Sequence, residues 1–506
     1  MQHKPKTTHT KLMTAAALFA FACFGAAQTA TSHAADDQAL CDHVEDELLF
    51  DQAVVSTHID VSCQEGIVTL EGTVDNILAK ERAERQAEAV RGVKSIVNLI
   101  VVQPRVARTD SEIQADIGTA LLSDPATDSY QVDAAVDGGK VTLTGAADSW
   151  QEKQLAARVA KGVAGVTAVD NQIDVNYPDE RTDAELKEEI EARLQHDVFL
   201  DGAPFVDVSV DDGHVSLTGE VGSALEKTRA RTRAWVYGVE NVDASGLDVE
   251  DWTGDDRERD TAHPMLSDSE IAEAVDDALL YDPRTNSFNV DVSVYNGSVT
   301  LRGTVDNLKA KRAAEQDARN TIGVYSVNNR IRVRSNGEPT DEEIRQRIEN
   351  ALLRNPYTES YEITVSVDNG TVDLFGTVDS YFEKAEADDV ASNVRGAIFV
   401  DNNLVVSDES DSYIYDPYVD DYDPYDYEWY GYDPQYTFST DSEIEEEIND
   451  ELWWSPFVDS DQVSVTVENG TAILTGTVDT YYERQAAAEN AIEGGAISVD
   501  NELKIE

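Results

Sequence analysis

A glycine-flanked phrase occurs six times in this chain of 506 residues and constrains the fold more than any other feature. Each copy begins and ends with glycine and carries apolar residues at alternate positions in between. The flanking pairs are Gly66/Gly72, Gly139/Gly145, Gly213/Gly219, Gly297/Gly303, Gly370/Gly376 and Gly470/Gly476. Successive copies begin 73, 74, 84, 73 and 100 residues apart. Because this period exceeds that of a solenoid unit, it predicts six similar small domains.

Each module is expected to begin with a helix. Five modules carry a capping box such as Thr109-Asp-Ser-Glu112. In this motif the hydroxyl of the first residue accepts a hydrogen bond from the backbone amide of the glutamate, and the glutamate side chain accepts one from the backbone amide of the first residue. The first module departs from this pattern, with Asp36 as its expected N-cap. Apolar residues then follow at helical spacing. Examples are Ile113, Ile117, Leu121 and Leu122, and also Ile271, Val275, Leu279 and Leu280.

The rest of each module follows a fixed order. An alternating strand leads through a tight turn such as Asn296-Gly297 into the second strand, where the closing glycine is expected to let the chain leave the sheet. A second helix ends at a glycine C-cap, and a third strand often opens with Val-Asp-Asn. Ala244 replaces that asparagine in the third module. The order predicts an α+β fold, α-β-β-α-β, with two helices packed on a three-stranded mixed sheet.

The module resembles the BON domain, named from bacterial osmotically inducible and nodulation proteins. The Gly-x-Val-x-Leu-x-Gly hairpin, the glycine helix stop and the Val-Asp-Asn strand entry carry this resemblance, which covers nearly all of the chain after its N-terminus. It implies an exported or envelope-associated protein without enzymatic activity. The family is usually proposed to bind phospholipid surfaces and to protect the envelope under osmotic stress. It brings no catalytic residues and no cofactor.

The expected bounds follow from the repeats. A signal peptide spans 1–34, the six modules span 36–105, 109–178, 181–250, 267–335, 339–407 and 440–506, and linkers span 251–266 and 408–439. The first linker is acidic. The second is rich in Tyr, Asp and Pro, so we expect a stiff, partly extended connection. Its tyrosines and Trp429 leave open a sticky contact segment or an interfacial anchor.

The N-terminus is typical of a secretory signal. Lys4, Lys6 and Lys11 precede an apolar stretch over 12–27, which is short for a membrane span. Ser32-His33-Ala34 then places small residues at the two positions that a signal peptidase recognises. We therefore expect a periplasmic or otherwise exported protein.

Two cysteines remain after the signal, Cys41 and Cys63. An oxidising compartment favours one disulfide between them. Two free thiols, or a metal site that also uses His43 and His58, remain alternatives. That metal spacing matches no known zinc pattern.

The acidic surplus limits the partners. The chain has 100 Asp and Glu against 39 Lys and Arg, a net charge of −61. Such a surface repels nucleic acid, so no nucleic-acid partner is expected. It attracts hydrated cations, so we expect weak, diffuse divalent binding without a defined metal site or cofactor.

Positive charge concentrates on the second helices. Basic residues there could solvate an exposed face and pair with nearby glutamates. Alternatively they form a face that binds phospholipid headgroups, with several weak modules adding by avidity. The lipid-binding candidates are Lys80, Arg82, Arg85, Lys227, Arg229, Arg231, Arg233, Lys309, Lys311 and Arg312.

No constellation in the sequence indicates catalysis. The histidines after the signal are scattered, and a nucleophile elbow, a metalloprotease helix and a phosphate-cradling loop are missing. The sequence thus favours a non-enzymatic envelope protein that binds phospholipid surfaces weakly and at several points, in osmotic or envelope stress. The alternative is a periplasmic protein-interaction scaffold or chaperone-like holdase that captures partners at exposed sheet edges.

Overall fold

The computed structural model describes most of the six modules. It covers residues 26–51, 53–54, 58–127, 131–177, 181–200, 206–249, 266–286, 288–334, 339–359, 362–407, 440–455 and 457–505. The expected linker 408–439, nearly all of the linker 251–266 and residues 1–25 of the expected signal lie outside this range.

Every module has the α-β-β-α-β order that the sequence predicts. The first helices are α1 (Ala26–Phe50), α3 (Asp110–Ser123), α5 (Asp183–Gln195), α7 (Asp268–Tyr281), α9 (Asp341–Arg354) and α11 (Asp441–Trp454). The second helices are α2 (Ile77–Glu88), α4 (Trp150–Lys161), α6 (Ala224–Arg233), α8 (Leu308–Arg319), α10 (Tyr381–Ser392) and α12 (Tyr481–Glu493).

Each sheet consists of a hairpin and a third strand. The hairpins are β1 (Ile59–Gln64) with β2 (Ile67–Val74), β5 (Gln131–Asp137) with β6 (Lys140–Ala147), β8 (Val206–Asp211) with β9 (His214–Val221), β11 (Val290–Tyr295) with β12 (Ser298–Val305), β15 (Thr364–Asp368) with β16 (Thr371–Val378), and β18 (Val463–Glu468) with β19 (Thr471–Val478). The 3-10 turn η3 (Ser460–Gln462) precedes β18. The third position is taken by β7 (Ala168–Val175), β10 (Asn241–Val249) and β17 (Phe399–Val406), or by the shorter pairs β3 (Ser95–Asn98) with β4 (Val101–Val102), β13 (Ser326–Asn329) with β14 (Arg332–Val333), and β20 (Ser498–Asn501) with β21 (Lys504–Ile505).

The second strand lies at the centre of every sheet. In module five, β16 pairs antiparallel with β15, with Val365 opposite Leu374, and parallel with β17, with Val372 opposite Val400. The same order recurs in the other five sheets. The sheet is therefore mixed, as expected, because a hairpin gives an antiparallel pair and a crossover helix gives a parallel one.

Among the described residues, six large hydrophobic cores correspond to the six modules, and a small seventh cluster joins Ala53 to Phe382. In module five the core joins Ile344 and Ile348 of α9 to Val372 and Leu374 of β16, all of which are buried. A few residues cross between modules, such as Phe199 of module three, which packs into the core of module six. The glycine-flanked hairpins thus belong to distinct compact units that also pack against one another.

The aspartate after each capping hydroxyl ties the first helix to the hairpin. In module five, Asp341 accepts hydrogen bonds from the amides of Asn369 (2.9 Å) and Gly370 (3.0 Å). Asn369 and Gly370 both have positive φ, 51° and 77°, as a type I′ turn requires. Four other aspartates make the same pair of bonds in their own modules: Asp110, Asp183, Asp268 and Asp441.

The asparagine of the third strand ties that strand to the second helix. Asn402 donates to the carbonyl of Lys384 (2.6 Å) and accepts from the amide of Leu404 (3.3 Å). Asn98, Asn171, Asn329 and Asn501 make the same two bonds. Module three differs because Ala244 is buried at this position, and the pairing of β10 with β9 shifts between Asp243 and Gly246.

The expectation that the closing glycine lets the chain leave the sheet is wrong in all six modules. Each second strand continues two residues beyond this glycine, as β16 does from Gly376 to Val378. The glycine instead permits a close approach of the chain just before the first strand, since a Cβ on Gly376 would lie 2.7 Å from the carbonyl oxygen of Glu362. Its φ, between 127° and 158° in the six copies, also disfavours other residues. The closing glycines that lie within a strand are Gly72, Gly145, Gly219, Gly303, Gly376 and Gly476.

Two further expectations about single positions are wrong. Asp36 lies inside α1 rather than at its N-cap, because the alanine-rich residues before it extend the helix. Leu122 and Leu280 are exposed rather than part of the core, since each follows a buried leucine and points about 100° away around the helix.

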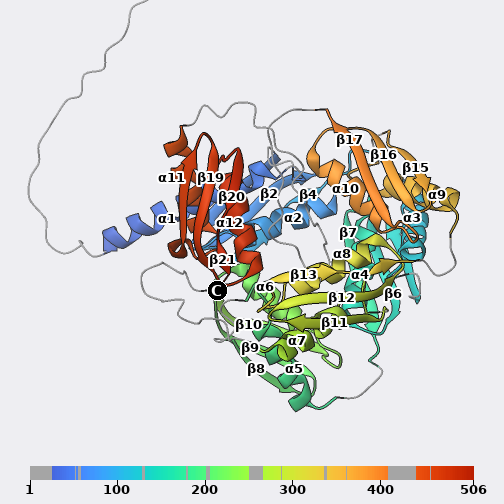
Figure 1. Cartoon of the computed structure of the whole chain (residues 1–506), viewed down its shortest axis with the longest axis horizontal. Coiled ribbons are helices and arrows are strands. Elements are labelled where there is room, and N and C mark those ends of the chain that lie inside the picture. Colours follow the sequence, from blue (N-terminus) through green and yellow to red (C-terminus); the bar gives the residue numbers. More distant parts are fainter. Residues whose placement is uncertain are drawn as a thin grey trace, which may run out of the picture.

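The modules assemble through their helices (Figure 1). α8 packs against α10, α2 packs against α6, and Arg82 of α2 lies over the ring of Phe382 of α10, 5.5 Å from its centroid. In Figure 1, α2, α8 and α10 lie near the middle of the molecule. Within the residues described, no helix combines the length and the apolar character needed to cross a membrane.

Candidate functional site

Most of the ten basic candidates contact other parts of the protein. Arg82, Arg229 and Arg233 are buried, Arg231 is exposed, and the other six are half-buried. The three buried arginines therefore do not belong to a solvent-facing surface. Lipid binding by these residues stays a prediction, with Arg231 the member most open to a surface.

In module three, two of these arginines surround one buried carboxylate. Arg229 Nε lies 2.9 Å from both carboxylate oxygens of Asp197, and Arg233 Nε also contacts Asp197. Burial alone would raise the pKa of Asp197, but the two guanidinium groups hold it below its usual value. Arg229 also lies over the ring of Phe199, 3.9 Å from its centroid. In module one, Arg82 pairs with buried Asp51 in the same way.

Two of the lysines stabilise their own module. Lys80 Nζ donates to the carbonyl of Ile100 (2.8 Å), and Lys227 Nζ donates to the carbonyl of Leu247 (2.6 Å). Lys311 is half-buried, and its backbone carbonyl accepts from Asn329. These bonds join the second helix to the third strand.

Two further candidates join modules four and five. Lys309 Nζ lies 2.7 Å from Asp389, and Arg312 lies 2.5 Å from Asp388 and 2.8 Å from the hydroxyl of Ser392. Lys309, Arg82 and Arg85 also line a central cavity of about 350 Å³.

Cys41 and Cys63 form a disulfide in the structure. Their Cα atoms lie 5.7 Å apart, and their positions differ by 22 in the sequence. The bond joins α1 to β1, so the alternative metal site with two cysteine ligands is not formed.

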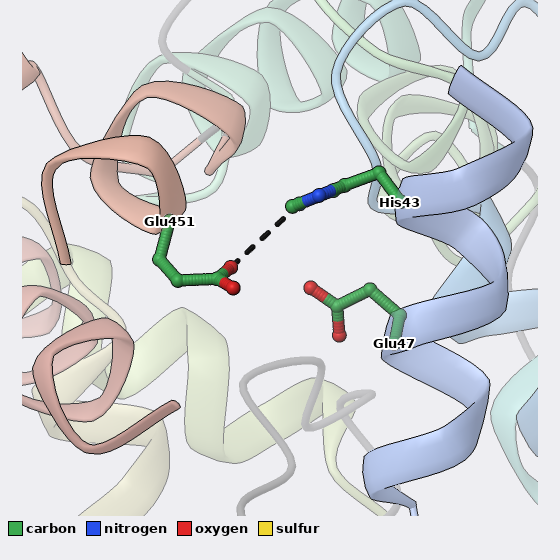
Figure 2. A group of neighbouring side chains, drawn as sticks. All are labelled: His43, Glu47 and Glu451. Carbon is green, nitrogen blue, oxygen red and sulfur yellow. Dashed lines mark ion pairs between the residues drawn. The ribbon is translucent and has the colours of Figure 1, made fainter. Parts of the chain in front are cut away.

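A different group meets between modules one and six (Figure 2). His43 and Glu47 of α1 face Glu451 of α11, and one ligand atom from each lies within 4.8 Å of the other two. His43 Nε2 lies 3.7 Å from a carboxylate oxygen of Glu451, and its ring stacks on Trp454 at 4.7 Å. One imidazole and two carboxylates form a set that could hold a divalent cation.

The electrostatics of this junction are unusual. Burial, together with Glu493 and Asp46, raises the pKa of Glu451 to about 8. Burial raises the pKa of Glu493 to about 7, and burial together with neighbouring carboxylates raises that of Glu47 well above its ordinary range. Burial lowers the pKa of His43 to about 4. Protons or a cation must offset these clustered carboxylates near neutral pH.

Sequence reasoning missed a polar residue that recurs after each first helix. In all six modules its side chain accepts from the backbone amide two residues on. The six residues are Asp51, Asp124, Asp197, Asp282, Asn355 and Ser455. Each of these residues lies three positions after the last buried leucine of the first helix. This constant spacing is visible in the sequence and could have indicated the shared role.

Comparison with known proteins identifies the same domain in all six modules. A family model described as the BON domain matches residues 36–104, 109–177, 182–251, 267–335, 340–408 and 440–506. Osmotically-inducible protein Y of Escherichia coli (strain K12) is 30% identical over 144 residues, which are 27% of this chain and 72% of that protein. An uncharacterized protein in the gshII 5′ region of Anaplasma centrale is 31% identical over 147 residues, 28% of this chain and 96% of that one.

The C-terminal domain of CdsD, described as the structural protein of the type III secretion system of Chlamydia trachomatis, matches with 16% identity and a TM-score of 0.12. The match covers 48% of this chain and 100% of the CdsD chain.

Proposed function

The chain belongs to the BON-domain family, and from this premise we propose that it is a non-enzymatic, exported envelope protein that binds phospholipid surfaces weakly at several points during osmotic stress. The N-terminal signal pattern supports export. The relation to a protein named for osmotic induction supports the stress role.

One repeated feature carries the lipid part of the proposal. The residue after the last buried leucine of the first helix is an exposed leucine in four modules. Leu49, Leu122, Leu280 and Leu353 are 60%, 72%, 45% and 61% exposed. A single exposed leucine is ordinary, but recurrence at one position of a repeat calls for a shared role. Module six has Trp453 there, and module three has Gln195.

These side chains suit a lipid surface better than the basic helices do. The net charge of −61 repels anionic headgroups, and most basic candidates are engaged within the protein. An apolar side chain that enters the acyl boundary gains about 1.5–3 kcal/mol when fully buried. Several such weak contacts on one chain add by avidity.

Vesicle flotation tests the proposal. We expect the chain to float with phosphatidylcholine vesicles and to lose this property when Leu49, Leu122, Leu280 and Leu353 are replaced by glutamine. The matched control replaces Tyr295, which is 76% exposed on a hairpin, by serine. Equal flotation of the leucine variant and the control, or no flotation of the native chain, would remove the proposed lipid contact.

An observation at one sheet edge favours the second candidate, a scaffold or holdase. Val97, Leu99 and Val101 are exposed along the β3–β4 edge, where each of these strands pairs only with β2 among the described strands. An apolar open edge can receive an extended partner. Suppression of aggregation of a model client, lost on replacing Leu99 by lysine, would support this role.

A further inference from the structure

The central cavity has a charge opposite to that of the whole chain. Residues of modules one to five line its volume of about 350 Å³. Eight lysine and arginine side chains belong to the described lining, against four aspartates and glutamates. Basic side chains therefore outnumber acidic ones in this lining, although the whole chain has a net charge of −61.

The four acidic side chains of the cavity already have partners. Glu81 pairs with Lys161 at 2.6 Å, and Asp389 pairs with Lys309 at 2.7 Å. Asp124 accepts from the side-chain amide of Asn393 (2.7 Å), and Glu386 accepts from that of Asn355. Outside the lining, Asp51 pairs with Arg82 and Asp282 pairs with Arg284, so acidic side chains offset most of the positive charge of the lining.

Helix α9 supplies two cations to the cavity that make no ion pair with any described residue. Arg347 is exposed, and Arg354 is half-buried. Burial lowers the pKa of Arg354, and Asp116 opposes this effect, but Asp116 is itself paired with Arg108. Arg354 is thus half-buried and only partly offset by a carboxylate that Arg108 also contacts, and a bound anion would complete this neutralisation.

We propose that this cavity binds a small phosphate-bearing anion. Its volume lies at the lower end of the range for small-molecule sites, about 300–1,000 Å³. Arginine suits this ligand because its planar group donates two parallel hydrogen bonds to phosphate oxygens. The site is built from several modules at once, so ligand binding also favours the assembled arrangement.

Isothermal titration of the full chain with inorganic pyrophosphate and with sn-glycerol 3-phosphate tests the proposal. We expect saturable binding, one site per chain, and about tenfold weaker affinity in Arg354→Gln and in Arg347→Gln, since each loses a charge-assisted contact. Arg345→Gln is the matched control. Arg345 lies on the same helix, but it pairs with Glu342 (2.6 Å) and Glu349 and does not line the cavity.

A parallel arm uses phosphatidylglycerol vesicles. Binding of the soluble phosphates alone identifies a soluble ligand, whereas vesicle binding that depends on Arg354 identifies a lipid headgroup. Arg347 is exposed, so its substitution carries little risk for folding and keeps the test valid if Arg354→Gln unfolds. The proposal is overturned if no probe binds, or if both cavity variants bind as tightly as Arg345→Gln. The leucine variant tested for flotation keeps the cavity, so the two proposals can fail separately.

Discussion

The hairpin end of each module and the helical junctions between modules are built in different ways. At the hairpin end, five modules use an aspartate at the same position for the same two bonds to the turn, as Asp341 does. The junctions use stacked tryptophans between modules two and three, a tyrosine bonded to Glu189 between modules three and four, and ion pairs between modules four and five. The module is thus a repeated unit, while its place in the assembly is specified by residues that do not repeat.

The largest expected effect is at a buried site in the arginine-rich module. Asp197→Asn keeps an oxygen for the amide of Phe199 but removes the charge that Arg229 and Arg233 contact. We expect a loss of about 3–5 kcal/mol in the free energy of unfolding, measured by urea titration, because breaking a buried ion pair is costly. The control Asp211→Asn, on an exposed strand position, should be near neutral. A loss below about 1 kcal/mol for Asp197→Asn would contradict this account.

A smaller effect is expected at the repeated asparagine. Asn402→Ala removes bonds to the carbonyl of Lys384 and the amide of Leu404. The expected cost is about 1–3 kcal/mol, because the carbonyl of half-buried Lys384 and the amide of buried Leu404 lose this partner. Ala244→Asn in module three should not stabilise the chain, since the shifted pairing there removes the geometry for these bonds. A gain in urea midpoint for Ala244→Asn would show that the shift is not the reason for the alanine.

The module was predictable from sequence because its signals are local. Capping boxes, Asn-Gly turns and alternating strands each specify the backbone within a few residues, and the structure has the predicted element order. The role of the closing glycines depends on a residue farther away in sequence, because the carbonyl that approaches Gly376 belongs to Glu362, just before the other strand of the hairpin.

The basic helices were also not predictable from local signals. Arg82 and Arg229 are typical of a solvated helix face, and only the position of a neighbouring module and of Asp51 or Asp197 makes them buried. The regular polar residue after the first helix was the missed local signal.

The junction between modules one and six should depend on pH. The folded chain keeps the proton of Glu451 up to about pH 8, because burial raises its pKa from the ordinary value of 4.5. The folded state binds more protons in this interval, so stability is full below the ordinary value and is lost as pH rises through about 8. The pKa of His43 is about 4 in the folded chain and 6.5 ordinarily, so this histidine does not interfere above pH 6.5.

Glu451→Gln should therefore reduce the fall in stability between about pH 6.5 and 8.5. Urea midpoints measured with a chelator at both pH values check this. Glu446→Gln on the exposed side of the same helix is the control and should behave like the native chain. Equal pH slopes in Glu451→Gln and the native chain would show that this carboxylate does not hold a proton at the junction.

The smallest effects on stability are expected at the hairpin ends. Because the five aspartates make equivalent bonds, these effects should be similar in all five modules. Substituting Asp110, Asp183, Asp268, Asp341 or Asp441 by asparagine, one at a time, should lower stability slightly and by similar amounts. Bonds from Gly138 and Gly139 lower the pKa of Asp110, so its contribution is lost as the solution is acidified below the ordinary value of 3.8. Widely different effects among the five variants, measured by hydrogen exchange at each hairpin, would contradict a shared role.

Small-angle X-ray scattering of the chain in solution tests the central claim most directly, namely that six repeated modules close around their second helices. A compact chain of this length has a radius of gyration of about 23 Å, and we expect a value near this. A value far above about 30 Å would mean that the modules form an extended string with exposed basic helices, and it would contradict the assembly described for these residues.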